Sequence, residues 1–281
     1  MRSTDAPVRR PVAAAQVLAV GSGGARRRPD TLVTEEPMEI RVHGPGEPPS
    51  PLAVTMRTPG DDFELAAGFL LTEGIVGGAD DVDRIAYCVG PDGAQEFNVV
   101  TVRTRHPVVE GLPVRAFPVS SSCGLCGRAS LDGLAARCAP VAGGPVVHAE
   151  VVRSLPDRLA GHQHLFGRTG GLHAAARFTP DGRLLAVRED VGRHNALDKL
   201  VGHALLTGAL PCSSEVLVVS GRLSFEIVQK AAVAGIPVIC AVSAPSNLAV
   251  AAATRLGQTV VGFLRGERFN VYSHPDRIAV A

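Results

Sequence analysis

Hydrophobic residues alternate with polar ones along the first half of the chain. This period of two predicts strands with one buried face over three segments: Met38–Val42, Leu52–Thr58 and Phe97–Arg103. Residues 61–73 have helical spacing instead, and we expect Asp61 or Asp62 to cap this helix and Gly74 to end it. The first half therefore predicts a small β-rich unit with one helix.

In the second half, hydrophobic residues form continuous runs separated by helical segments. The runs 215–220, 236–242 and 259–264 predict buried strands, and the segments 193–206, 225–234 and 247–256 predict helices. A strand pair, 173–178 and 183–188, comes before them. Buried strands that alternate with helices favour a parallel or mixed sheet with helices on both faces. Ligands of such sheets gather at the carboxyl ends of the strands, where residues 220–222, 243–246 and 263–266 fall.

These patterns divide the chain into three portions. Residues 1–30 are rich in Arg, Ala, Pro and Gly, and we expect a flexible basic tail ending in a short strand from Ala13 to Val20. A weak signal peptide is the alternative reading, but its apolar stretch is short and interrupted by Gln16. Residues 31–119 are the expected strand and helix portion, and residues 120–281 the α/β portion.

Composition narrows the function classes. Hydrophobic residues make up 46% of the 281 residues, which is enough for a substantial core, and a net charge of +1 gives no basic field for nucleic acid. No apolar run reaches membrane-spanning length, so we expect no membrane segment. Six cysteines in a chain of this length do not make a disulfide scaffold, which favours a reducing, cytoplasmic compartment. Cys240 ends an apolar run and is expected to be a buried strand residue.

Two cysteines share one local loop. Cys123 and Cys126 lie in Ser120-Ser-Ser-Cys-Gly-Leu-Cys-Gly-Arg128, between a short strand-like run and a predicted helix over 128–137. Helix N–H groups and Arg128 would lower the pKa of a thiol there, which suits redox or sulfur chemistry. A zinc site needs further ligands, and no second Cys-x-x-Cys exists. From these residues alone, a reactive pair, a metal site and a structural pair all remain open.

A second polar cluster predicts a binding site. Arg193, His194 and Asn195 begin a predicted helix just after Gly192, an arrangement that suits an anion or a polar heterocycle. The alternative is an ordinary solvated helix start. Arg222 lies in the turn Ser220-Gly-Arg222, which is a weaker signal for an anion. The usual phosphate-loop and dinucleotide motifs are absent from the sequence.

Together, five segments resemble the FdhD family, the formate dehydrogenase accessory sulfurtransferases. They are Ser121–Cys126, Thr169–His173, Glu189–Lys199, Val219–Arg222 and Tyr272–His274, in the family's order, and the resemblance runs from about Leu32 to the end. It implies a cytidine-deaminase-like α/β three-layer sandwich with a mixed sheet, beside the smaller β-rich N-terminal portion.

The resemblance also implies a function. Family members move sulfur from a cysteine desulfurase to the molybdenum cofactor, bis-molybdopterin guanine dinucleotide, before formate dehydrogenase receives it, and they act as homodimers. Cys123 matches the persulfide-carrying position and Cys126 the second position. The family's cofactor-binding segment falls on Phe263, Leu264, Arg265, Gly266, Glu267 and Arg268, and we expect Arg222, His194 and Asn195 to contribute to the same ligand site.

Two rival functions share features with this sequence. A zinc deaminase also uses Cys-x-x-Cys at a helix start, but it requires His-x-Glu upstream and a Pro before the first Cys. Here His43 and His106 are not followed by that pattern, and Ser122 stands where the Pro would be, so no catalytic metal is expected. The other rival is a non-catalytic chaperone that binds the cofactor without carrying sulfur.

Overall fold

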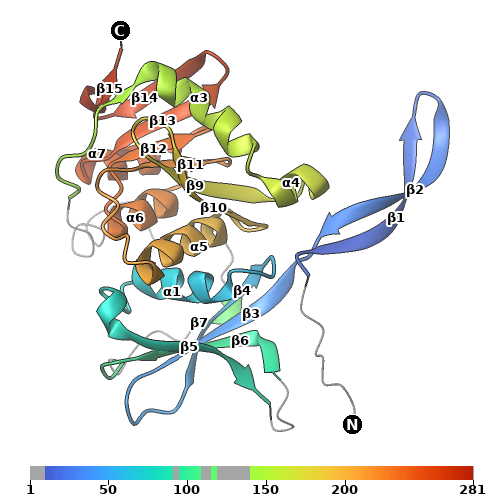
Figure 1. The fold of residues 1–281 in the computed structure, drawn as a ribbon, viewed down its shortest axis with the longest axis vertical. Coiled ribbons are helices and arrows are strands. Elements are labelled where there is room, and N and C mark those ends of the chain that lie inside the picture. Colours follow the sequence, from blue (N-terminus) through green and yellow to red (C-terminus); the bar gives the residue numbers. More distant parts are fainter. Residues whose placement is uncertain (1–9, 91–94, 109–114, 119–139, 281) are drawn as a thin grey trace.

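The computed structural model describes residues 10–90, 95–108, 115–118 and 140–280, with the backbone alone for 115–118. Two sheets make up the body of the molecule (Figure 1). The smaller has the strand order β5-β6-β3-β4-β7 and the larger the order β10-β9-β11-β12-β13-β14. In the larger sheet β11, β12 and β13 are parallel and the other pairings are antiparallel, so the expected mixed sheet is confirmed.

The smaller sheet contains the strands that the alternation predicts. Its members are β3 (Glu36–His43), β4 (Ser50–Arg57), β5 (Val82–Val89), β6 (Gln95–Thr104) and β7 (Arg115–Pro118). Helix α1 (Asp62–Thr72) follows β4, as the spacing predicts. Asp61 occupies the N-cap position, which is one of the two predicted, with a φ of 54°, but its side chain makes no capping hydrogen bond.

The larger sheet separates two layers of helices. Its strands are β9 (His173–Phe178), β10 (Leu184–Asp190), β11 (Val216–Val219), β12 (Val238–Ala241), β13 (Thr259–Arg265) and β14 (Arg268–Ser273). One layer holds α5 (Arg193–Leu206), α6 (Phe225–Val233) and α7 (Asn247–Arg255), and the other holds α3 (Ala149–Ala160). The short strands β8 (Val147–His148) and β15 (Ile278–Ala279) pair with each other in a separate two-stranded sheet. Helix α4 (His164–Thr169) precedes β9.

Successive residues of the central strands point into two different cores. Leu217 and Ile239 pack in the cluster that contains α1, α5, α6 and α7, whereas Val218 and Cys240 pack against α3. A continuous apolar run is what a strand covered on both faces requires, because both sets of side chains are then removed from water. Cys240 is fully buried, as expected.

Helices α1 and α5 join the two portions of the body. Their contact is unusually close, since a Cβ added at Gly202 would lie 1.8 Å from the carbonyl oxygen of Glu64. Beside this contact, the Lys199 ammonium lies 2.7 Å from the Asp190 carboxylate, and both side chains are buried. Lys199 also donates to the carbonyl of Thr58 at 2.9 Å. The smaller sheet is therefore fixed to the start of α5.

The N-terminal segment differs from its prediction. Residues expected as a flexible tail form a hairpin of β1 (Val12–Gly21) and β2 (Gly24–Val33), which projects from the body (Figure 1). The strand predicted from Ala13 to Val20 is confirmed within β1. Its partner β2 was missed because its polar residues, Arg26 to Arg28 and Asp30, lack an alternating apolar face.

Candidate functional site

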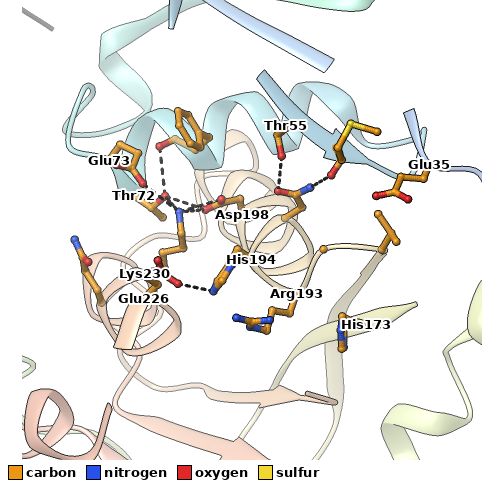
Figure 2. Close-up of a pocket in the computed structure, with 16 residues that line it drawn as sticks. Glu35, Thr55, Thr72, Glu73, His173, Arg193, His194, Asp198, Glu226 and Lys230 are labelled. Atoms are coloured by element: carbon orange, nitrogen blue, oxygen red, sulfur yellow. Dashed lines mark hydrogen bonds and ion pairs between the residues drawn. The ribbon is translucent and has the colours of Figure 1, made fainter. Parts of the chain in front are cut away.

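A cavity of about 420 Å³ opens between the two portions of the body. Figure 2 shows side chains of β4 and α1 on one side of it and of α5 and α6 on the other. It is lined by Glu35, Thr55, Met56, Phe69, Thr72, Glu73, His173, Val191, Gly192, Arg193, His194, Asn195, Asp198, Glu226, Gln229 and Lys230. The cavity includes the predicted helix start, so that cluster does border a space that can take a ligand.

Two helix starts meet at this cavity. Gly192, which has no side chain, is the N-cap of α5, and Ser224 is the N-cap of α6 but its side chain makes no capping hydrogen bond. His194 connects them, since its Nε2 lies 3.2 Å from Ser224 Oγ and 2.8 Å from Glu226 Oε2. The hydrogen bond from His194 lowers the pKa of the Glu226 carboxyl, which keeps it ionised. Free N–H groups at helix starts favour anions.

The His194 contacts do not form a serine nucleophile activated by a base. Such activation needs one ring nitrogen to accept from the serine while the other donates to a carboxylate. Here Ser224 and Glu226 both contact Nε2. A proton on Nε2 bonded to Glu226 leaves that nitrogen unable to accept from Ser224. The arrangement therefore suits orientation of His194 for binding more than acyl transfer.

Arg193 supplies an unsatisfied donor. Its Nε is buried and has no hydrogen-bond partner among the described residues, although the side chain lines the cavity (Figure 2). Buried polar atoms are normally paired, so an acceptor from a ligand would satisfy this one. Burial lowers the pKa of His173 on the same wall, and the positive charges of Arg193 and His194 lower it further. The wall therefore offers the permanent cation of Arg193 beside the ionised Glu226 carboxylate and a His173 ring that resists protonation.

The opposite part of the lining is a compensated ionic network. Lys230 Nζ donates to the Asp198 carboxylate at 2.9 and 3.0 Å and to Thr72 Oγ1 at 2.8 Å, and it lies 5.6 Å from the centroid of the Phe69 ring. Burial raises the pKa of Asp198, and the Lys230 charge opposes that rise. Because Lys230 is already paired, it adds less attraction for an anion than Arg193 does.

Asn195 has a structural part in the site. Its amide nitrogen donates to the Met56 carbonyl at 2.7 Å and to Asp190 Oδ1 at 3.1 Å, and its amide oxygen accepts from Thr55 Oγ1 at 3.1 Å. Both polar ends of the side chain are therefore engaged within the protein. Asn195 holds β4 against the start of α5 and gives the cavity its shape.

A second cavity, of about 490 Å³, adjoins the first. The two share Thr72, Glu73 and Gln229 as lining residues. The second is also lined by Pro140, Val141 and Ala142, which directly follow the segment that contains the cysteine pair. Cys123 and Cys126 themselves lie outside the described residues, as does the helix predicted over 128–137.

The remaining predicted binding residues do not line either of these cavities. Arg222 is exposed, and it is close enough to His173 for its charge to lower the pKa of that ring. Phe263, the first residue of the predicted segment Phe263–Arg268, lies within β13 with a φ of 53° and an exposed side chain, and its N–H donates to the Ser243 carbonyl at 3.1 Å. Arg265 Nε donates to the Val242 carbonyl at 3.1 Å.

Within this segment the side chains differ in accessibility. Arg265, Gly266, Glu267 and Arg268 are exposed, and Glu267 pairs with Arg153 at 3.5 Å. Leu264 is fully buried in the core against α3. The prediction that Leu264 contacts a ligand is therefore wrong for its side chain, which is buried in the core. Only the backbone of Leu264 can contact a ligand. The alternation of a strand explains this, because a residue between two exposed neighbours points to the opposite face.

Sequence reasoning missed several cavity residues. Lys230, Glu226 and Thr72 lie on α6 and α1, far from the helix start in sequence, and no local motif marks them. Lys230 carries a weak signal, because a lysine on the buried face of an amphipathic helix needs a partner. Among the described residues, no group of three metal-ligating side chains is assembled, and no helix is long and apolar enough to span a bilayer.

Comparisons with known proteins agree on one family. The FdhD/NarQ family model matches residues 33–279. The sulfur carrier protein FdhD of Streptomyces avermitilis is 56% identical over 274 residues, covering 94% of this chain and 95% of that protein. Its counterpart in Mycobacterium tuberculosis is 50% identical over 262 residues, covering 89% and 92%.

A solved structure extends the comparison to the fold. The crystal structure of a protein from Desulfotalea psychrophila, described as a formate dehydrogenase accessory protein, matches with a TM-score of 0.75 and 27% identity. The match covers 96% of this chain and 100% of that one. The agreement of sequence, coverage and fold leads to one conclusion: this chain belongs to the FdhD/NarQ family.

Proposed function

We propose that this chain is a sulfur carrier required for formate dehydrogenase activity. In this proposal Cys123 accepts sulfur from a cysteine desulfurase, and the sulfur passes to the molybdenum cofactor, bis-molybdopterin guanine dinucleotide, before formate dehydrogenase receives it. The names of the relatives support sulfur carriage and the formate dehydrogenase connection. The acceptance of persulfide, the cofactor and the desulfurase rest on the family resemblance of the cysteine pair.

The lining of the first cavity is the main structural support for binding of the cofactor. Arg193 offers a buried donor that has no acceptor in the described part of the chain, and the starts of α5 and α6, neither of which has a side-chain cap, meet there. Phosphate groups satisfy both features at once, because they are anionic and accept several hydrogen bonds. A volume of about 420 Å³ suits one nucleotide-sized part of the cofactor, so the rest of the ligand must extend beyond it.

The positions of the residues that flank the cysteine segment support delivery of sulfur to the first cavity. On the N-terminal side, Pro118 of β7 pairs with Val54 of β4, the neighbour of Thr55 in the cavity wall. On the C-terminal side, Pro140 lines the adjoining cavity. Pro118 and Pro140, the described residues that flank this segment, therefore both lie close to the proposed ligand site.

The chemical step at Cys123 is a thiol exchange. Its thiolate attacks the outer sulfur of the desulfurase persulfide, a new sulfur–sulfur bond forms on Cys123, and the desulfurase cysteine leaves as a thiolate. Cys126 is proposed to assist or protect that sulfur. We also propose a cytoplasmic location, a homodimer and a likeness to the cytidine deaminase fold. The alternative function is a chaperone that only binds the cofactor.

The proposal is tested by separating sulfur loading from ligand binding. The purified chain is incubated with a cysteine desulfurase and cysteine, and mass spectrometry maps an added sulfur atom. We expect it on Cys123, absent in Cys123→Ala and retained in Cys126→Ala. Activation of formate dehydrogenase by Cys123→Ala would contradict the assignment. Loss of loading with cofactor binding and activation intact would favour the chaperone.

Ligand binding has its own readout. We expect Arg193→Gln to weaken binding of guanosine monophosphate, the nucleotide part of the cofactor, by about tenfold, because the neutral side chain loses its charge-assisted hydrogen bond. Arg183→Gln changes an exposed arginine outside the cavity and serves as the matched control. Equal affinities of the two variants, measured by calorimetry, would contradict the placement of the phosphate.

A further inference from the structure

The hairpin β1–β2 contributes no buried residue to the core, and it contacts the body through β2, at α4 and at Gly171. Its strands pair over ten residues each in a separate two-stranded sheet, and none of the residues from Val12 to Val33 is buried. Leu18 and Val20 are 61% and 76% exposed. An isolated two-stranded ribbon is marginally stable in water. A hairpin that keeps ten pairs without burying a side chain suggests that another molecule covers it.

The two edges of the hairpin are unlike. The outer edge of β2 carries Arg26, Arg27, Arg28 and Pro29, which are residues that discourage a further strand from pairing. The strand β1 contains no charged residue and no proline in its ten residues. Among the described residues no strand other than β2 pairs with it. The β1 edge is therefore open to an additional strand.

The charge of the hairpin indicates what kind of strand would bind. Three arginines stand against one acidic residue, Asp30, whereas the whole chain has a net charge of only +1. Asp30 lies 3.8 Å from Arg28 in an exposed pair, so it compensates little of this charge. Ala19, opposite Arg26 in the register, is small and leaves space beside that arginine. An acidic segment complements this surface, and the hairpin of a second copy would add like charge.

The root of the hairpin lies at the proposed ligand site. A Cβ added at Gly171 would be 3.1 Å from Val33 Cγ1, so the end of β2 packs on the loop that leads to His173. Glu35, two residues beyond the hairpin, lines the first cavity (Figure 2). A protein held by the hairpin is consequently held near the mouth of that cavity.

We infer that the hairpin is a docking arm whose β1 edge binds an acidic, extended segment of formate dehydrogenase. The inference rests on the proposed function for the identity of this partner. Main-chain pairing along β1 supplies affinity, and Arg26 to Arg28 supply attraction for the acidic side chains. The arm thus brings the receiving enzyme to the cavity from which the cofactor is delivered.

The test measures binding of the full-length chain to purified apo-formate dehydrogenase by interferometry. Two arm variants are compared: R26E/R27E/R28E, and L18K/V20K. The controls are R84E/R105E/R183E, which reverses three exposed arginines of the body, and Val280→Lys, at another exposed apolar position. We expect each arm variant to weaken binding about tenfold or more, and the loss from charge reversal to shrink at high salt. The melting temperature stays unchanged.

Several outcomes overturn the inference. Binding that is unchanged in the arm variants, or reduced equally in the controls, removes the arm from the interface. If light scattering shows that L18K/V20K turns a dimer into a monomer while enzyme binding is intact, the edge pairs copies of this chain instead. Sulfur loading of Cys123 is measured in every variant. Its failure in the unaltered chain refutes the proposed function. Its loss in arm variants that keep their melting temperature overturns the inference, because the arm would then serve sulfur loading and not the docking of formate dehydrogenase.

Discussion

The contact between helices α1 and α5, here called the seam, and the hairpin β1–β2 are opposite in burial. At the seam, ten of the 14 residues of α5 are buried, and the helices approach until no Cβ fits at Gly68 or Gly202. In the hairpin none of the residues is buried, and apolar side chains face solvent. The seam therefore contributes to the stability of the fold, whereas the hairpin contributes surface. The difference separates residues needed for folding from residues available for binding.

The largest effect on stability is expected at the seam from Gly202→Ala. The added Cβ would lie 1.8 Å from the Glu64 carbonyl oxygen and 2.8 Å from the Gly68 nitrogen, both backbone atoms, so the helices must separate. We expect a loss of about 3 kcal/mol or more in the free energy of unfolding, measured by urea denaturation. Gly167→Ala in α4 is the control, because nothing lies within 4 Å of its added Cβ. Equal stability of the two variants would contradict the close approach.

Lys199→Met tests the ionic contact beside the seam. It leaves the Asp190 carboxylate buried without its cation, although Thr58, Gly192 and Asn195 still donate to that carboxylate. Removal of one partner of a buried pair costs about 3 kcal/mol. Addition of Asp190→Asn removes the uncompensated charge, so the double variant should recover part of the loss. A variant as stable as the parent chain would show that Asp190 needs no cation.

A smaller, pH-dependent effect on the free energy of unfolding is expected at the cavity, whose His173 is less buried than the seam and more buried than the hairpin tip. His173 resists protonation because its pKa in the folded state is lowered below the ordinary 6.5, whereas the unfolded chain binds a proton near that value. The free energy of unfolding should therefore fall as pH drops from 6.5 toward the lowered pKa. The fall should be shallower in His173→Gln. Burial also lowers the pKa of His203, so some acid sensitivity remains in that variant. Identical slopes in urea denaturation across this pH range would exclude a contribution from His173.

The smallest effect is expected in the hairpin. Leu18→Ser with Val20→Ser should change the free energy of unfolding by less than about 0.5 kcal/mol, because both side chains are already exposed. Leu217→Ser, at a fully buried leucine of β11, is the contrasting substitution and should cost several times more. A large loss in the hairpin variant would mean that these side chains support the fold, and it would remove the contrast with the seam.

Particular elements explain how far the sequence could be read. Helix α5 was predicted with its observed bounds, because Gly192 and Gly208 flank a single helical pattern. The strands of the larger sheet were predicted because runs of β-branched residues are typical of strands buried on both faces. Strand β2 was missed, since its arginines fit neither period, and its partner β1 alone determines its register. Helix α4 is only six residues long and has no pattern to detect.

The candidate site divides in the same way. The sequence by itself determined the helix start at Arg193 to Asn195, the spacing of the cysteine pair and the family to which they point, because each is a local arrangement of residue types. Only the tertiary structure decided that Lys230 and Thr72 line the cavity, that Asn195 holds β4 against the start of α5 and that Leu264 is buried. These facts depend on which distant elements pack together. Packing is decided by the sum of many contacts across the chain, and no single segment contains that sum.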